Sequence, residues 1–269
     1  MAFFPDGSPC WVDVGLPDAE AGKHFYGELL DWTFEDTGPE TGHYTLALSD
    51  GQPVAAIVPE TSGRPSAVWT VYLAVPDVGA AAERVRAAGG RVTVQPTALG
   101  ELGKLAVVRD PCGVAFGLWE GGELPGFGKR DAPSSFTWSE LHTRDSSVVD
   151  SFYKGVFGYD AQPTIGPTGS FDYEAWYARG SEDGASIGRL QMPADAPAGL
   201  PTQFLVYFSV ESCDAAERTI RDRLGGRIHF VAHDGPLGRT LKVADGQGAA
   251  FALISTTSLS VGRQMSSAR

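Results

Sequence analysis

The chain has 269 residues, of which 42% are hydrophobic and 20% are charged, so it can build large cores and global disorder is excluded. Its formal net charge of −12 argues against nucleic acid or an anionic membrane as the main partner, because both favour a basic surface. No apolar run is long enough to cross a membrane, and the three cysteines match neither a disulfide framework nor a metal motif. We therefore expect a reduced, cytoplasmic protein whose acidity serves solubility.

The first half of the chain contains two units of similar design. Pro9–Gly15 alternates as a strand, and Asp18 then opens a helix that runs to Leu30. Short strands follow near residues 32–35, 43–48 and 54–58. The second unit begins with a strand at Val68–Val75, and Asp77 caps a helix over Val78–Ala88 that ends at a glycine pair. Three more strands are predicted near residues 91–94, 105–108 and 114–119.

The second half repeats the first. Trp11, Asp18 and Phe25 recur as Trp138, Asp145 and Phe152, each displaced by 127 positions. Later in the repeat the displacement becomes 135, with Asp110 and Gly113 recurring as Asp245 and Gly248. A fixed offset over unrelated residue types indicates an internal duplication. The change in offset places a net insertion in the second half, most simply in the Gly- and Pro-rich region Gly180–Pro201.

Four units of one strand, one helix and three strands predict an α+β fold of curved mixed sheets with helices on their outer faces. The other two helices are expected over Ser147–Val156 and Cys213–Leu224. We predict an N-terminal domain over residues 1–120, a linker over 121–135, a C-terminal domain over 136–256 and a flexible tail over 257–269.

The order of these features resembles the vicinal oxygen chelate superfamily, which includes glyoxalase I, extradiol dioxygenases and bleomycin-resistance proteins. The resemblance rests on four βαβββ units, on the Phe-Tyr pairs Phe25-Tyr26 and Phe152-Tyr153, and on the Asp-Pro-x-Gly turn at Asp110–Gly113. It covers nearly the whole chain and implies two tandem glyoxalase-like domains, similar to tandem actinobacterial proteins often loosely called hydroxylases. The superfamily name alone fixes no single reaction.

The resemblance also implies where a metal would be held, and the ligands are missing there. Metal-using relatives place His or Glu on the first strand of each unit pair, on the second unit's first strand and on the last strand. The residues at these positions cannot act as ordinary side-chain ligands: Trp11, Trp138, Thr70, Leu205, Gly117 and Ala252. We therefore predict no metal and no other cofactor. A shift of the alignment by two residues would bring in Asp13 or Glu140, and a shift by four would bring in His142.

Strand alternation puts Trp11 with Asp13 on one face, and Trp138 with Glu140 and His142 on the corresponding face of the second half. If these faces line the cups of the superfamily, the tryptophans offer stacking area and the acids offer orientation or a proton. We interpret Asp13, Glu140 and His142 as candidate catalytic residues. The candidate ligand-binding residues are Trp11, Trp138, Tyr72, Tyr207 and Thr70.

A second interpretation treats the same residues as structural. Trp11 and Trp138 then fill the cups as core, Asp13 and Glu140 pair with arginine or cap a neighbouring strand, and His142 is a satisfied structural residue. A carboxylate buried in an apolar cup would have its pKa raised, which allows general acid–base chemistry without demonstrating it. The Phe-Tyr pairs are expected to pack helix against sheet.

These residues are compatible with three functions. The leading hypothesis is a metal-independent protein that binds a small aromatic or polyketide-like molecule in a Trp-lined cup, as a sequestering or carrier protein or in natural-product tailoring. The first alternative is a metal-free acid–base enzyme of isomerase, lyase or hydroxylase type that uses Glu140 and His142. The second alternative is a divalent-metal lyase or dioxygenase. The expected partner is the small molecule, and the chain is expected to be a monomer or homodimer.

Overall fold

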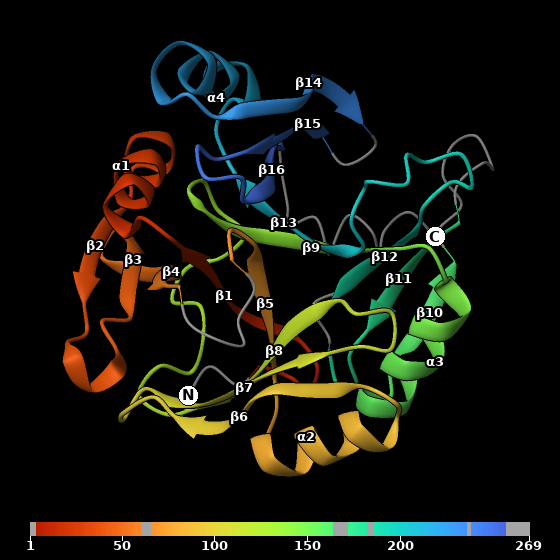
Figure 1. The fold of residues 1–269 in the computed structure, drawn as a ribbon. Helices are drawn as coiled ribbons and strands as arrows, with labels where there is room; N and C mark the ends of the chain where they lie inside the picture. The colour runs from red at the N-terminus through yellow and green to blue at the C-terminus, as the bar shows by residue number, and fades with distance from the viewer. Residues whose placement is uncertain (1–3, 61–65, 164–171, 182–185, 236–237, 257–269) are drawn as a thin grey trace.

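The computed structural model describes residues 4–60, 66–163, 172–181, 186–235 and 238–256, and the predicted tail over 257–269 lies outside them. Within these ranges the strands form two eight-stranded mixed sheets, one from each half of the chain (Figure 1). The helices lie toward the outside of the sheets, so the predicted α+β class with four βαβββ units is confirmed.

The first sheet has the strand order β2-β3-β4-β1-β5-β8-β7-β6. Central strand β1 runs parallel to β4 and antiparallel to β5. Helices α1 (Ala19–Leu30) and α2 (Val78–Ala87) follow the first strand of each unit, and a short 3₁₀ turn covers Pro39–Thr41. The strands are β1 (Pro9–Leu16), β2 (Thr33–Asp36), β3 (Thr45–Ser49), β4 (Gln52–Pro59), β5 (Trp69–Ala74), β6 (Arg91–Ala98), β7 (Gly103–Arg109) and β8 (Ala115–Gly121).

The second sheet repeats this order as β10-β11-β12-β9-β13-β16-β15-β14. Helix α3 (Ser146–Phe157) is regular, whereas α4 (Cys213–Thr219) continues as a π-helical turn over Ile220–Leu224. Units one and two therefore share one sheet and units three and four share the other, a pairing that the sequence left open. The strands are β9 (Ser135–Thr143), β10 (Asp160–Pro163), β11 (Tyr173–Tyr177), β12 (Ile187–Gln191), β13 (Gln203–Ser209), β14 (Arg227–Gly235), β15 (Gly238–Ala244) and β16 (Ala250–Ser255).

The two halves are tied together by a pair of matching contacts. Tyr26 of α1 donates a hydrogen bond to Asp245 Oδ2 at 3.0 Å, and Tyr153 of α3 donates to Asp110 Oδ2 at 3.4 Å. Asp110 also accepts from the backbone N–H of Val114, which holds its own turn closed. The Phe-Tyr pairs thus pack helix against sheet, as predicted. Tyr26 contacts Trp69 and Tyr153 contacts Trp176 on their own sheets. The two phenylalanines contact the sheet of the opposite half, Phe25 at Phe251 and Phe152 at Phe116.

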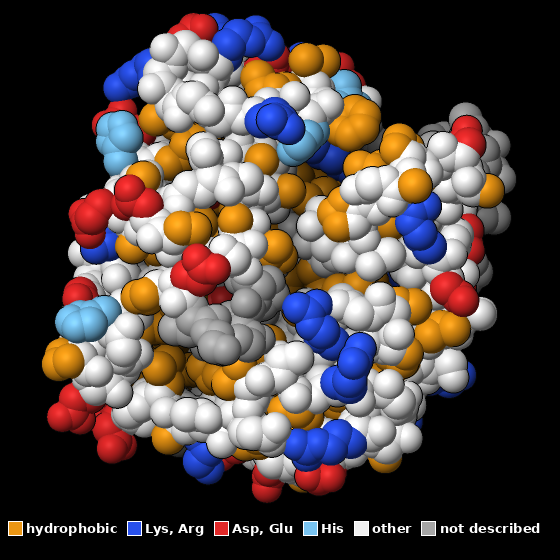
Figure 2. Space-filling model, viewed as in Figure 1, with side chains coloured by type: hydrophobic (Ala, Val, Ile, Leu, Met, Phe, Trp, Pro, Cys, Tyr) orange, Lys and Arg blue, Asp and Glu red, His pale blue; other side chains and the backbone are white. Residues whose placement is uncertain are grey.

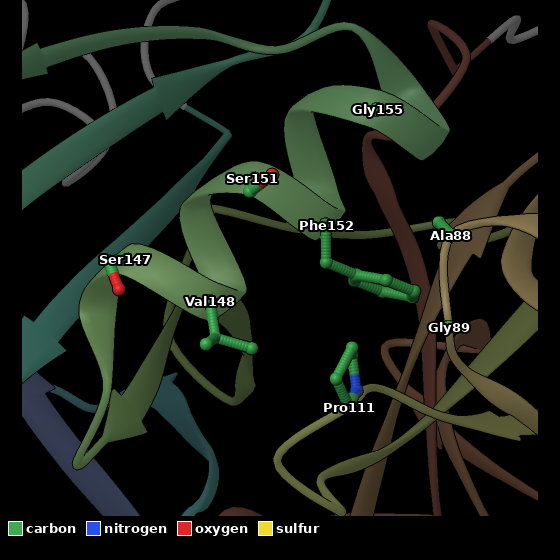
Figure 3. Close-up of a pocket in the computed structure, with 8 residues that line it drawn as sticks. All are labelled: Ala88, Gly89, Pro111, Ser147, Val148, Ser151, Phe152 and Gly155. Carbon is green, nitrogen blue, oxygen red and sulfur yellow. The ribbon is translucent and has the colours of Figure 1, made fainter.

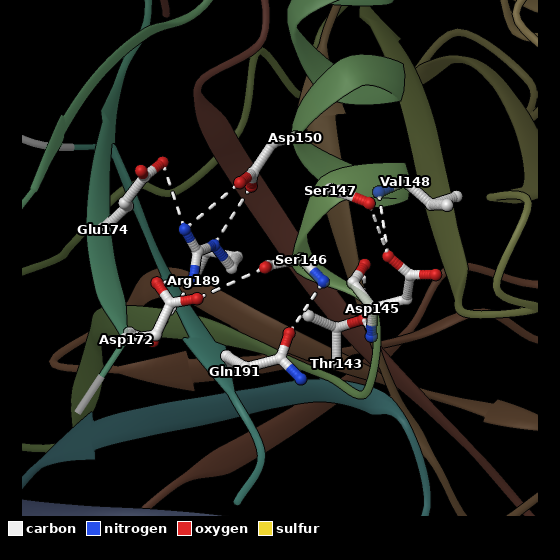
Figure 4. A network of polar contacts seen from close by, with 10 residues as sticks. All are labelled: Thr143, Asp145, Ser146, Ser147, Val148, Asp150, Asp172, Glu174, Arg189 and Gln191. Atoms are coloured by element: carbon white, nitrogen blue, oxygen red, sulfur yellow. Dashed lines mark hydrogen bonds and ion pairs between the residues drawn. The ribbon is translucent and has the colours of Figure 1, made fainter. Parts of the chain in front are cut away.

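Helix α3 is fastened to the second sheet by a buried arginine (Figure 4). Arg189 of β12 is 1% exposed and binds Asp150 of α3 through two hydrogen bonds of 3.0 and 3.1 Å. The same guanidinium reaches Asp172 and, at 3.2 Å, Glu174 of β11. Its counterpart in the first half is Ile57, which is fully buried beneath α1. At this matching position, the second sheet therefore holds its helix through ion pairs, whereas the first sheet packs an apolar side chain beneath its helix.

Candidate functional site

Each sheet also has a face that points away from its own helices, which we call its inner face. On the N-terminal inner face the side chains of Trp11, Asp13 and Tyr72 come together. Trp11 Nε1 donates to Tyr44 Oη at 2.7 Å, and Tyr44 in turn donates to Asp13 Oδ2 at 3.3 Å. Tyr72 donates to the same carboxylate oxygen at 2.8 Å. All four side chains are at most 2% exposed, so this constellation is part of the main core.

The C-terminal inner face carries the same constellation. Trp138 Nε1 donates to Tyr173 Oη at 3.2 Å, and Tyr173 donates to Glu140 Oε1 at 3.2 Å. Tyr207 donates to Glu140 Oε2 at 2.7 Å. His142 adds a contact that the first half lacks, with Nε2 at 3.1 Å from Glu140 Oε2. The structure therefore brings together the predicted residues of each half, but it keeps the two sets on separate sheets.

Strand register explains why these side chains meet. Trp11 pairs with Tyr72 and Asp13 with Thr70 across β1 and β5, while Trp138 pairs with Tyr207 across β9 and β13. Directly paired residues point to the same face of a sheet. Thr70 is 3% exposed and its counterpart Leu205 is 4% exposed, so both lie beside the carboxylates in buried positions.

Two glycines make room for the tyrosines. A Cβ atom at Gly117 would lie 2.0 Å from Tyr72 Cδ1, and one at Gly188 would lie 2.0 Å from the Tyr173 hydroxyl oxygen. Both distances are far shorter than any van der Waals contact. The aromatic rings therefore occupy the space that a side chain at these positions would need.

The two inner faces differ along the row of strands that leads to the sheet edge. In the first half the row continues from Tyr72 through Gly117 and Val107 to Val94. In the second half it continues from Tyr207 through Ala252 and Lys242 to Phe230. Val107 is fully buried, whereas Lys242 is partly exposed and Phe230 is 61% exposed.

A further difference lies on the first strands. His142 stands where the first half has Gly15, and its side chain is 16% exposed. Phe127, between β8 and β9, packs on Trp11 with ring centroids 5.6 Å apart, which helps to bury the N-terminal inner face. The C-terminal aromatic residues instead form a separate small cluster around Trp138, Leu205 and Tyr207. The second half therefore holds the more accessible and more polar of the two inner faces.

The charge state of Glu140 differs from the sequence-based expectation. Burial alone would raise its pKa, but the bond and charge of His142, the charge of Lys242 and the bond from Tyr207 outweigh burial and lower the pKa to about 2. The prediction of a raised pKa for a carboxylate in an apolar cup is therefore wrong for Glu140, because the surroundings are polar. Burial and the Glu140 charge raise the pKa of Tyr207 and of Tyr173, so both hydroxyls remain protonated donors.

A divalent metal does not fit the positions that hold it in metal-using relatives. The side chains at the positions that the resemblance implies are buried, and the Tyr72 ring fills the space at Gly117. Within the described ranges no group of three or more His, Cys, Asp or Glu side chains has the arrangement of a metal site. Glu140 and His142 supply two potential ligands, one fewer than the three protein ligands of a typical catalytic zinc site.

The surface of the second half has a hollow on the face shown in Figure 2. Figure 2 shows a hollow lined by hydrophobic side chains between strands β14–β16 and the segment that joins β12 to β13. Strands β9 and β13, which carry Glu140 and Tyr207, cross behind this region in the same view. The most accessible polar side chain on β9 is His142, which is 16% exposed.

A second concave region lies elsewhere, where the two halves meet outside the sheets (Figure 3). This groove has a volume of about 680 Å³ and lies between the end of α2, Pro111 and one side of α3. Its hydroxyl groups belong to Ser147 and Ser151, and Ser147 already donates to Asp145. None of the predicted site residues lines it, and it offers few groups that would fix a ligand. We therefore place the candidate site on the C-terminal inner face.

Fold and site together define a tandem βαβββ protein in which two inner faces share one aromatic–carboxylate constellation. The first half, over residues 11–118, matches the family model of the Glyoxalase/Bleomycin resistance protein/Dioxygenase superfamily. The chain is also 33% identical over 269 residues to the anthracycline biosynthesis protein DauV of Streptomyces sp. (strain C5), with 94% of this chain and 95% of that protein covered. The chain belongs to this superfamily, as its sequence predicted.

Another relative is the putative glyoxylase CFP32 of Mycobacterium tuberculosis, 31% identical over 257 residues with 93% of this chain and 95% of that protein covered. Among solved structures, the Mn(II)-bound glyoxalase of Novosphingobium aromaticivorans has a TM-score of 0.63 at 17% identity and covers 93% of this chain and 82% of its own. The 2,3-dioxygenase LapB of Pseudomonas sp. KL28 has a TM-score of 0.62 at 14% identity, with 95% and 94% covered. At these identities the structural likeness shows the fold alone.

Sequence reasoning missed three residues of the C-terminal inner face: Tyr173, Lys242 and Phe230. Two of them had a detectable signal, because Lys242 aligns with Val107 at the offset of 135 and Tyr173 aligns with Tyr44 at an offset of 129. In the part of the chain that the structure describes, no helix is long and apolar enough to cross a membrane. A cytoplasmic location and a monomeric or dimeric state stay predictions.

Proposed function

We propose that the C-terminal inner face binds a small, flat aromatic or polyketide-like molecule, and that the chain serves natural-product metabolism as a binding or tailoring protein. The observation that carries this proposal is the difference between the two copies of one constellation. The first copy is at most 2% exposed, whereas in the second Trp138 is 2%, Tyr207 5% and Glu140 8% exposed. The second copy also adds His142, a partly exposed Lys242 and an exposed Phe230. A pocket with aromatic walls and a few polar groups is typical of small-molecule sites.

The similarity to the anthracycline biosynthesis protein DauV supports the class of ligand. The aromatic side chains supply flat apolar area, and Glu140 is an ionised acceptor held in place by two tyrosine hydroxyls. Such an acceptor suits a ligand hydroxyl group that lies in the plane of the ring system. In this function Glu140 orients the ligand and does not transfer a proton.

Acid–base catalysis on the same molecule is a second candidate, and the Glu140–His142 contact of 3.1 Å favours it. A carboxylate with a pKa of about 2 is a weak base at neutral pH. The proton would therefore move through His142, with Glu140 fixing the ring orientation and stabilising an imidazolium. These roles differ from the sequence-based hypothesis, in which Glu140 and His142 were equal candidates and Asp13 was a third.

We further propose that the protein works without a bound metal. The test is the metal content of the purified, untagged protein by elemental mass spectrometry, as isolated and after incubation with Fe²⁺, Mn²⁺, Ni²⁺ and Zn²⁺. We expect less than about a tenth of an equivalent throughout, since functional sites of this kind hold metal tightly. Near-stoichiometric metal that is lost in Glu140→Gln or His142→Ala would contradict the proposal and favour a metal enzyme.

The binding and enzymatic functions are separated by one variant. Isothermal titration of anthraquinone-2-carboxylic acid into the wild-type protein tests for the site, and Glu140→Gln keeps the size of the side chain while removing its charge. A binding protein changes in affinity with Glu140→Gln and shows no chemical change of its ligand by mass spectrometry. An enzyme turns the ligand over, and Glu140→Gln then lowers the rate while affinity is largely kept. Absence of any binding of ring systems of this size would contradict the proposed function.

A further inference from the structure

We propose that Lys242 is an anion-recognition residue of the C-terminal inner face, so that the ligand carries an acidic oxygen (a phenol, enol or carboxylic acid) on its aromatic ring system. This inference rests on the proposed function, because it names the chemistry of the molecule that the face would bind. It assigns the ammonium group of Lys242 to the ligand oxyanion and the carboxylate of Glu140 to a neutral hydroxyl group elsewhere on the ligand.

The position of Lys242 follows from strand register. Trp138 pairs with Tyr207, Tyr207 with Ala252, and Ala252 with Lys242, so one row of side chains crosses four strands on the same face. Phe230 on β14 ends the row and is 61% exposed. Ala252, the smallest member, lies between Tyr207 and Lys242 in this row.

The ammonium group of Lys242 has no close polar partner within the described part of the protein. Lys242 is close enough to Glu140 for its charge to lower the pKa of that carboxyl group. Nevertheless, no ion pair within 4.0 Å and no hydrogen bond joins its ammonium group to the described residues. An ammonium group has three donors, and at a partly exposed position such as Lys242 they are satisfied by water or by an acceptor of a bound molecule. The first half shows that folding does not require it, because Val107 fills the equivalent position and is fully buried.

The opposite charges of Glu140 and Lys242 would orient a ligand on the C-terminal inner face. Glu140 is ionised, so a ligand anion beside it would be repelled, whereas an anion beside Lys242 would be attracted. The aromatic side chains between the two groups accept the apolar part of a ring system. A flat molecule with an acidic oxygen at one end and a neutral hydroxyl group at the other matches this arrangement, and a wholly neutral aromatic compound satisfies only half of it.

The test compares two probes of nearly equal shape, anthraquinone-2-carboxylic acid and its primary amide, by isothermal titration calorimetry at low salt. We expect the wild-type protein to bind the acid about tenfold more tightly than the amide, because one charge-assisted hydrogen bond distinguishes them. In Lys242→Met the acid should lose this advantage while the amide binds within about twofold of wild type. Lys242→Arg should restore most of the preference.

Lys154→Met on the exposed side of α3 serves as the matched control and should leave the acid-to-amide ratio unchanged. An unaltered ratio in Lys242→Met, with the thermal midpoint preserved, would overturn the assignment of Lys242. Weak but equal binding of both probes by wild type would also overturn it, although the proposed function would stand. If neither probe binds, the proposed function itself fails and this inference falls with it.

Discussion

Each of the two inner faces holds one tryptophan, two tyrosines and one carboxylate, but their surroundings differ. In the first half the Trp11–Tyr44–Asp13–Tyr72 constellation is buried to 2% exposure or less and continuous with the main core. In the second half the matching residues form a separate small cluster. Duplication allows one copy to keep the fold stable while the other copy changes its surface chemistry. The comparison therefore identifies the second copy as the candidate site without any bound ligand.

The two sheets also differ on their helix-covered faces, and a substitution there should cause the largest loss of stability. Arg189→Ala should destabilise the protein by about 3 kcal/mol, because it leaves Asp150, Asp172 and Glu174 without their shared cation beneath α3. Chemical denaturation by urea measures this change. The exposed Arg179→Ala on the neighbouring segment should cost less than about 0.5 kcal/mol. Equal effects of the two variants would contradict a structural role for the Arg189 network.

The charge on Glu140 should appear in the pH dependence of stability. Its pKa is lowered from 4.5 to about 2 in the folded protein, so its contribution is present above pH 4.5 and is lost as the pH falls through 2. A shift of this size corresponds to at most about 3 kcal/mol at neutral pH. Glu140→Gln should remove this pH dependence, as measured by urea denaturation between about pH 2.5 and about pH 7, a range set by the shift.

The exposed Glu83→Gln is the control for that series, since Glu83 contributes only a surface ion pair with Arg86. Its stability curve should follow wild type at every pH. A Glu140→Gln curve that also follows wild type would show that the carboxylate is not held in its ionised form by its neighbours.

Substitutions at Gly117 and at its counterpart Ala252 test how closely the tyrosine of each inner face packs against the neighbouring strand. Gly117→Ala should cost about 2 kcal/mol, because its Cβ atom would lie 2.0 Å from the Tyr72 ring and the ring must move. The reverse change at the matching position of the second half, Ala252→Gly, should cost only about 1 kcal/mol. Thermal unfolding of both variants gives the comparison. An unaffected Gly117→Ala protein would contradict the packing of Tyr72 against β8.

The smallest predicted effects come from substitutions of the two tryptophans, one of which should change ligand affinity and the other stability. Trp138→Phe should weaken binding of anthraquinone-2-carboxylic acid by about threefold to tenfold, as one aromatic contact is reduced. Trp11→Phe should lower stability and leave the affinity within about twofold of wild type, because Trp11 lies on the other sheet, away from the C-terminal inner face. Titration calorimetry at matched folded fractions distinguishes the two. Reversed results would assign the ligand to the first half.

Much of this fold could be predicted from the sequence because its signals are local and repeated. The Asp18 and Asp145 helix caps, the strand alternation at Trp11 and Trp138, and the constant offset each depend on short segments. The side-chain partners could be predicted only in part, since Tyr44 and Tyr173 reach their carboxylates from strands whose register is set by the whole sheet.

The electrostatics are the least predictable part. A carboxylate next to tryptophan in the sequence predicts an apolar environment and a raised pKa. For Glu140 the sign of the shift is reversed by His142 and by Lys242, which is far away in the sequence but near in the fold. Contacts between distant segments contribute to such shifts, and a single sequence gives no direct signal for them. Aligning the two halves position by position places Lys242 opposite Val107 and would reveal the difference.

The most direct test of the central claim is hydrogen–deuterium exchange of the protein with and without saturating anthraquinone-2-carboxylic acid. We predict slower exchange in β9, β13 and β15 of the second sheet, around Glu140, Tyr207 and Lys242, with no change in β1 or β5 of the first. Protection confined to β1 and β5, or to the groove beside α3, would contradict the assignment of function to the C-terminal inner face.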